Sequence, residues 1–271
     1  MAEQDTCDIE GNSDFYGLGV RAGFYAQWTS TLLANVLVRE EDTLSRTINL
    51  MLQLAVLICV AFLTLRKAIY IPEVMIAFWL LVGGPWNLTW GPVNRSGTLA
   101  ALSRAAFYTS LCGYGCWFFF GGWDRLPPTP CESVGFVGGA GMRGGFLPAG
   151  KALSIGGLIA CASVLGWSAY EHFTSRSRGG GSKTRVKASC RPHMDVALLA
   201  LSLLAVVLPI VLIEALVRDN HLTGVGDVLE PGQLIPLFVG AFGILGTFVS
   251  FVSQERLFAP QCLTLFGRHL T

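Results

Sequence analysis

Four charged side chains lie in or beside long apolar stretches of this 271-residue chain: Arg21, Glu73, Lys151 and Glu214. A charge among apolar residues is costly unless it is paired, so such residues form structural ion pairs or serve a function. Two acids and two bases can neutralise one another in a network that fixes the order of helices. Alternatively, they line a polar pocket for a small ligand, or Glu73 or Glu214 acts as a catalytic acid.

Other kinds of chemistry have no motif in the sequence. It contains no Gly-x-Ser-x-Gly elbow, no dinucleotide fingerprint and no Gly-Lys-Ser/Thr phosphate loop. Cys112 and Cys116 share a helix face, but no histidine or further cysteine is near them in sequence. We therefore expect no metal, no cofactor and no nucleic acid partner. The four histidines fall in predicted loops or tails: His172, His193, His221 and His269.

The apolar stretches predict the fold class. The chain is 52% hydrophobic and 14% charged, whereas roughly 25% of residues are charged in ordinary soluble domains. Seven stretches reach the length of about 17 residues with which an α-helix crosses a bilayer. We predict an all-α polytopic membrane protein, a seven-helix transmembrane domain of residues 1–271 with the lipid bilayer as its partner. The predicted spans are residues 15–38, 47–65, 71–90, 99–123, 147–170, 195–217 and 233–252.

Basic residues predict the orientation of this bundle. The loop at residues 171–193 carries six Lys or Arg residues against one acid, and such an excess marks the cytoplasmic side. The N-terminus then lies outside and the C-terminus in the cytoplasm, with 11 of the 19 basic residues in inside loops and five in outside loops. The glycosylation sequons at Asn87 and Asn94 fall in a short inside loop, where we expect no glycan. In this orientation Arg21, Glu73, Lys151 and Glu214 share the outer half of the bilayer.

The loop at residues 171–193 is also rich in glycine and serine, which predicts a flexible segment. It serves either as a topology determinant alone or as a segment that anionic lipid headgroups attract. On the opposite side, Cys7 and Cys131 are the two cysteines placed clearly in the oxidising outer compartment. They are the candidate disulfide pair.

Paired small residues predict where helices approach closely. Gly19 and Gly23 form a GxxxG motif in the first span, and the seventh span contains Gly240, Gly243 and Gly246. Such faces are usually packing surfaces.

Three motifs carry a resemblance to a known group of proteins. They are the run from Asp14 to Trp28, DFYGLGVRAGFYAQW, the Ile-Pro-Glu73-Val start of the third span, and Cys131-x-x-x-Gly-Phe136. Together they resemble uncharacterised multi-spanning integral membrane proteins of filamentous ascomycete fungi. The glycine-rich run at residues 137–145 departs from the more aromatic and charged sequence expected there. The resemblance implies a fungal origin and a connection with growth or secondary metabolism, and no mechanism.

The sequence therefore predicts a non-enzymatic sensor or accessory factor in the plasma membrane or an endomembrane of the secretory pathway, with a small apolar ligand. The first alternative is an intramembrane cyclase or isomerase that uses Glu73 or Glu214 on an apolar substrate. A small-molecule transporter is the third, although no inverted repeats are visible. The partners of the two carboxylates distinguish the first two hypotheses.

Overall fold

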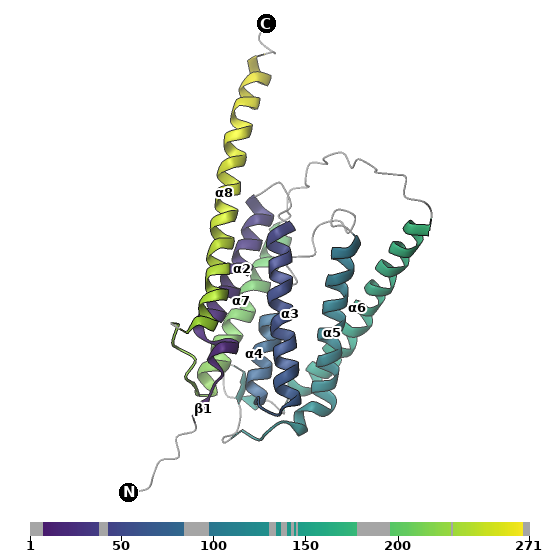
Figure 1. Cartoon of the computed structure of the whole chain (residues 1–271), viewed down its shortest axis with the longest axis vertical. Coiled ribbons are helices and arrows are strands. Elements are labelled where there is room, and N and C mark those ends of the chain that lie inside the picture. Colours follow the sequence, from purple (N-terminus) through teal and green to yellow (C-terminus); the bar gives the residue numbers. More distant parts are fainter. Residues whose placement is uncertain are drawn as a thin grey trace.

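The structure, a computed structural model, describes residues 8–37, 43–83, 98–129, 134–136, 140–141, 144, 146–177, 196–228 and 230–267. In these residues a four-residue helix, α1 (Ser13–Tyr16), is followed by seven α-helices of at least 12 residues (Figure 1). These are α2 (Leu18–Leu37), α3 (Thr43–Leu65), α4 (Ile71–Val82), α5 (Thr98–Trp117), α6 (Phe146–Ser177), α7 (Val196–Asp219) and α8 (Pro231–Gly267).

Each predicted span overlaps one of these helices. The described part of the chain is mainly helical, as predicted. Four helices, α3, α6, α7 and α8, are long and apolar enough to cross a membrane. The apolar helix α4 has 12 residues, and the rest of its predicted span, residues 84–90, lies outside the described residues. The remaining two helices, α2 and α5, are less apolar than these four. Polar residues such as Gln27 in α2 and Arg104 in α5 lower their hydropathy.

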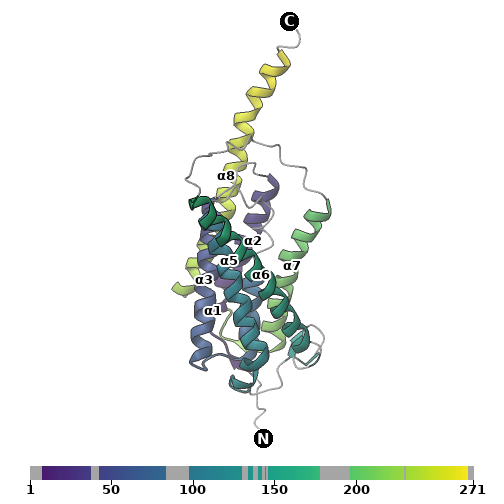
Figure 2. The ribbon, with the colours of Figure 1, turned by 90° about the vertical axis from the view of Figure 1, so that its right-hand side faces the viewer.

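Two helices extend further than predicted. The helix α6 continues to Ser177, seven residues into the predicted loop, and α8 continues to Gly267, 15 residues past its predicted end (Figures 1 and 2). A hydropathy pattern ends where the apolar run ends, but a helix continues while its residues favour helical conformation. The rest of the predicted basic loop, residues 178–193, lies outside the described residues, as do Asn87 and Asn94.

Short strands supplement the helices in the described residues. The strands β1 (Ile9–Glu10) and β4 (Leu222–Thr223) pair in parallel, and β2 (Val134–Phe136) pairs antiparallel with β3 (Ala140–Gly141). The first pair joins the N-terminal segment to the connection between α7 and α8. Because Phe15 and Tyr16 of α1 are also buried, this segment packs into the end of the bundle.

Glycines allow α2 to pack closely against the N-terminal part of α8, whose remainder extends past the bundle (Figure 1). A β-carbon at Gly23 would lie 2.3 Å from the carbonyl oxygen of Pro236, and one at Gly240 would lie 2.5 Å from the carbonyl oxygen of Gly23. The small-residue faces predicted in the first and seventh spans are thus packed against each other. Only glycine fits here because the obstacle is backbone, which has no other rotamer to adopt.

Aromatic rings connect α6 to the bundle. The ring of Phe119 lies in a π-helical turn, η2 (Phe118–Gly122), which follows α5. It stacks on Phe78 of α4 with a centroid distance of 5.7 Å and meets Phe146 of α6 edge to face at 5.9 Å. Pairs of this kind add stability beyond the area that they bury.

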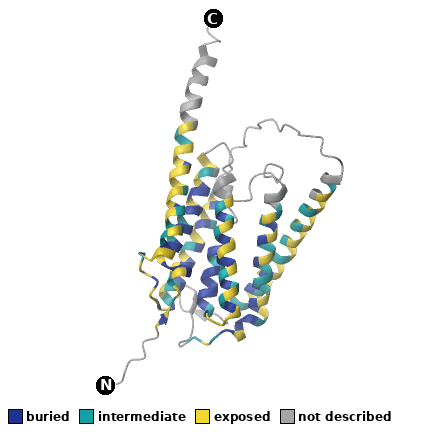
Figure 3. Cartoon of the chain, in the orientation of Figure 1, coloured by how far each residue is buried: buried dark blue, intermediate teal, exposed yellow. Residues whose placement is uncertain are grey.

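Burial divides the helices into an inner and an outer set (Figure 3). Most described side chains of α4 are buried, whereas α6 and α8 expose apolar residues along most of their described length. Within their candidate spans, 6% of the α6 window and 11% of the α8 window are buried. Such apolar outer faces are what a lipid environment requires.

Candidate functional site

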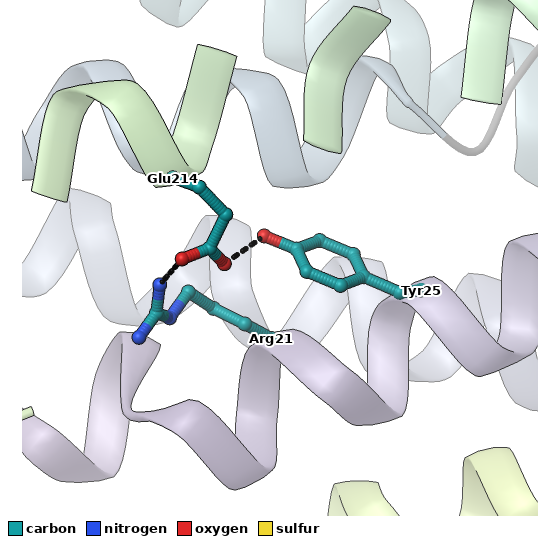
Figure 4. A network of polar contacts seen from close by, with 3 residues as sticks. All are labelled: Arg21, Tyr25 and Glu214. Atoms are coloured by element: carbon teal, nitrogen blue, oxygen red, sulfur yellow. Dashed lines mark hydrogen bonds and ion pairs between the residues drawn. The ribbon is translucent and has the colours of Figure 1, made fainter. Parts of the chain in front are cut away.

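The centre of the candidate site is an ion pair between α2 and α7 (Figure 4). The guanidinium of Arg21 donates from Nη1 to Oε2 of Glu214 at 2.5 Å, and the hydroxyl of Tyr25 donates to Oε1 of Glu214 at 2.8 Å. Arg21 and Tyr25 are four residues apart in α2 and therefore share one helix face. Together they hold both carboxylate oxygens of Glu214.

The two ends of the ion pair differ in exposure. The side chain of Arg21 is 4% exposed, whereas that of Glu214 is 46% exposed. Glu214 continues a stripe of exposed apolar residues on α7, formed by Leu204, Val207 and Val211. It lies five residues before the end of α7 at Asp219, a distance of about 8 Å along the helix axis. A buried cation is thus neutralised by an acid that reaches the outer surface of the bundle near a helix end.

The second acid, Glu73, has a different set of partners. Its side chain is buried and accepts hydrogen bonds from the hydroxyl of Tyr16 at 2.9 Å and from the backbone N–H groups of Tyr70 at 2.8 Å and Asn12 at 3.4 Å. Glu73 is the third residue of α4, where a carboxylate bonds back to the N-cap and faces the positive end of the helix dipole. It therefore fixes the start of α4 and anchors the N-terminal segment.

Lys151 stands apart from both acids. Its ammonium group lies over the ring of Phe120, 5.2 Å from the ring centroid. The four charges that the sequence places at one depth thus occupy three environments, and only Arg21 and Glu214 form an ion pair with each other. The depth of a residue follows from its position in the sequence, but the neighbouring helix that its side chain faces does not.

Sequence reasoning missed the two tyrosines that bind the acids. Tyr25 carried a signal, because its spacing of four residues from Arg21 predicts a shared helix face. Tyr16 carried none, since its contact with Glu73 joins residues 57 positions apart.

The cysteines of α5 and α6 show a contact that the sequence did not predict. Cys161 of α6 lies close to Cys112, so a further cysteine does lie beside the Cys112 and Cys116 face. Even so, the described residues hold no group of three or more His, Cys, Asp or Glu side chains placed to bind a metal. The predicted disulfide pair, Cys7 and Cys131, lies outside the described residues.

This thiol contact predicts a specific cross-link. Mild oxidation of membranes should join Cys112 to Cys161, and mass spectrometry without reduction should recover the linked peptides, because the two cysteines lie close together. The variant Cys112→Ser should lose the link. A link from Cys116 to Cys161 in the unmodified protein would contradict the register of α5 against α6.

The arrangement at Glu214 allows binding chemistry. An ionised carboxylate offers about four acceptor positions, and Arg21 and Tyr25 occupy two of them. The Glu214 side chain is 46% exposed, so it can be reached from outside the bundle. The site can therefore accept a hydrogen bond from a molecule that approaches along the apolar face of α7.

Fold and site together define a helical protein with four helices suited to a membrane and a polar cluster on its outer wall. Comparisons with protein-family models, with curated proteins and with solved structures find no match.

Proposed function

We propose that this protein is a non-enzymatic membrane sensor or accessory factor, which binds an amphipathic small molecule at Arg21, Tyr25 and Glu214. The observation that carries the proposal is the half-exposed carboxylate of Glu214 within the exposed apolar stripe of α7. If the carboxylate served only to neutralise Arg21, enclosing it fully would cost less free energy, because a charge at an apolar surface is unfavourable.

The chemistry of the cluster defines the class of ligand. The ion pair has no net charge, so it does not select a charged ligand. Its free acceptor positions require a hydrogen-bond donor, and Val207 and Val211 offer apolar contact beside them. The best match is a neutral alcohol with a long apolar body, bound with its hydroxyl on Glu214 and its body along α7.

A catalytic role for the acids has less support. Three hydrogen-bond donors of the protein already bind the carboxylate of Glu73. One of them, the hydroxyl of Tyr16, belongs to the N-terminal segment, which covers Glu73. A substrate would have to displace this segment before it reached the carboxyl group. Glu214 is engaged by Arg21 and Tyr25, an arrangement that suits recognition better than proton transfer.

A matched pair of probes tests the proposal. Hexadecanol should raise the midpoint of thermal unfolding of the purified protein in a concentration-dependent way, because it stabilises only the folded state. Its methyl ether keeps the chain but lacks the donor, and it should have little effect. The double variant Arg21→Met, Glu214→Leu removes the acceptor and should lose the response to hexadecanol. Equal responses to the two probes would refute recognition through the hydroxyl.

We further propose that all seven helices span a membrane of the secretory pathway, with the N-terminus outside and the loop at residues 171–193 in the cytoplasm. The excess of basic residues in that loop supports this orientation. The motif of residues 14–28 supports kinship with the fungal membrane proteins that it resembles. The loop then lies where anionic lipid headgroups attract it.

This topology makes a prediction for inserted glycosylation tags. A tag in residues 178–193 should stay unmodified, and a tag in residues 126–145 should receive a glycan. Tag modification is read as a shift in gel mobility that glycosidase treatment removes. A native glycan at Asn87 or Asn94 would reverse the proposed orientation.

A further inference from the structure

The helix α2, which carries Arg21, begins at an N-cap residue that has no side chain. The backbone N–H of Arg21 donates to the carbonyl oxygen of Gly17 at 3.0 Å, which makes Gly17 the N-cap of α2. Typical N-cap residues, such as serine or aspartate, accept a hydrogen bond through their side chain from the second or third backbone N–H of the helix. Glycine has no such acceptor, so the first turn of α2 depends on acceptors from other segments.

The start of α8 and the connection before it supply these acceptors. The backbone N–H of Gly19 donates to Oε1 of Gln233 in α8 at 3.0 Å. The backbone N–H of Leu18 donates to the carbonyl oxygen of Val225 at 2.9 Å. The amide orientation of Gln233 is fixed from both ends, because its nitrogen donates to the carboxylate of Glu230 at 3.3 Å. Gln233 therefore provides, from a neighbouring helix, the side-chain cap that α2 itself lacks.

Glycines of α2 leave the space that the Gln233 side chain fills. A β-carbon at Gly17 would lie 2.5 Å from Oε1 of Gln233, and one at Gly19 would lie 2.8 Å from its Cβ. The Gln233 side chain is fully buried in this position. Close fit on both sides thus holds the amide at the first turn of α2.

This capped turn lies beside the ligand site. Gly19 is two residues before Arg21, and helical side chains point back toward the N-terminus of their helix, so the Arg21 side chain lies along the capped turn (Figure 4). Its guanidinium reaches Glu214 of α7 at 2.5 Å. If the first turn unwinds, the Arg21 side chain loses the direction that brings it to Glu214.

We propose that Gln233 is a positioning residue of the ligand site, which closes the first turn of α2 from α8 and thereby directs Arg21 to Glu214. Gln233 acts through the backbone of α2 and not on the ligand itself. Its effect on ligand binding rests on the proposed function, whereas its effect on the ion pair does not.

The energetic coupling between Arg21 and Glu214 tests this role without a ligand. The cycle of Arg21→Met and Glu214→Gln is measured in the unmodified protein and in Gln233→Met, which keeps the length of the side chain but lacks the acceptor. Gln233→Met should lower the midpoint of thermal unfolding by about 2–4 °C and clearly reduce the coupling. An unchanged coupling energy would overturn the proposal, even if the midpoint falls.

Two further variants separate positioning from a general loss of stability. The exchange Glu230→Gln with Gln233→Glu again offers an acceptor to the N–H of Gly19, and its negative charge suits the positive end of α2. It should restore the coupling. Ser30→Ala removes another contact between α2 and α8, the hydrogen bond with Thr247 at 2.9 Å, about 14 Å along α2 from the ion pair. It should leave the coupling unchanged, and the opposite result for either variant would overturn the positioning role.

Binding of hexadecanol tests whether the same cap serves the ligand site. Gln233→Met should weaken the apparent affinity about fivefold, because a cap of typical strength changes the ratio of formed to unwound turn by about that factor. Ser30→Ala should leave the affinity unchanged. Equal affinity of Gln233→Met and the unmodified protein would overturn the positioning role. Reduced coupling in Gln233→Met, together with no binding of hexadecanol to the unmodified protein, would overturn the proposed function alone.

Discussion

Replacing Glu214 with glutamine is expected to destabilise the protein more than replacing Arg21 with methionine. Glu214→Gln leaves a guanidinium that is 4% exposed without its counter-ion, at a cost of roughly 3 kcal/mol. Arg21→Met leaves a carboxylate that is 46% exposed, lies near the end of α7 and keeps its bond to Tyr25, so the loss should be smaller. The difference follows from which charge is left buried.

A double-mutant cycle on unfolding free energy measures this pair. Combining Glu214→Gln with Arg21→Met should recover part of the single losses, because both charges are removed together. The same cycle between Arg21 and Glu73 is the control and should be additive, since hydrogen-bond donors and not Arg21 hold Glu73. Additivity in the Glu214 cycle would mean that Arg21 and Glu214 are not energetically coupled.

Replacing Gly23 with alanine should separate α2 from α8. The new β-carbon would lie 2.3 Å from the carbonyl oxygen and 2.4 Å from the carbonyl carbon of Pro236, so one helix must move. We expect a loss of about 3 kcal/mol in unfolding free energy, the upper end for overpacking of an interior.

Gly156 of α6 provides the matched control for this substitution. It is also a helical glycine, but a β-carbon there would meet no atom within 4 Å. Gly156→Ala should therefore leave stability unchanged or raise it by up to about 1 kcal/mol through better helix propensity. Equal effects of the two substitutions in thermal unfolding would show that α2 and α8 do not approach closely at Gly23.

The sequence predicted the helices well because hydropathy is a local property. It located all seven long helices but gave the ends of α6 and α8 poorly, since polar residues continue a helix as readily as they end it. It also missed the capping role of Glu73, although proline followed by glutamate is a signal for a helix start.

Contacts between helices were harder to predict. The GxxxG motif at Gly19 and Gly23 indicates a close approach but does not specify α8 as the partner. Equal depth made Glu73 and Glu214 equivalent candidate partners for Arg21. Only the packing of α2 against α7 selects Glu214, and packing depends on residues nearly 200 positions apart.

Photolabelling tests the central claim, that Glu214 recognises a hydroxyl on the apolar wall of α7. A hexadecanol probe with a diazirine near its hydroxyl should label peptides of α7 around residues 207–218 in membranes, and excess hexadecanol should compete. The double variant Arg21→Met, Glu214→Leu, which removes the acceptor without stranding a buried charge, should abolish this labelling and leave any background labelling of the exposed helix α8 unchanged. Labelling of α7 that persists in this double variant, or that unlabelled hexadecanol does not displace, would contradict the proposed site.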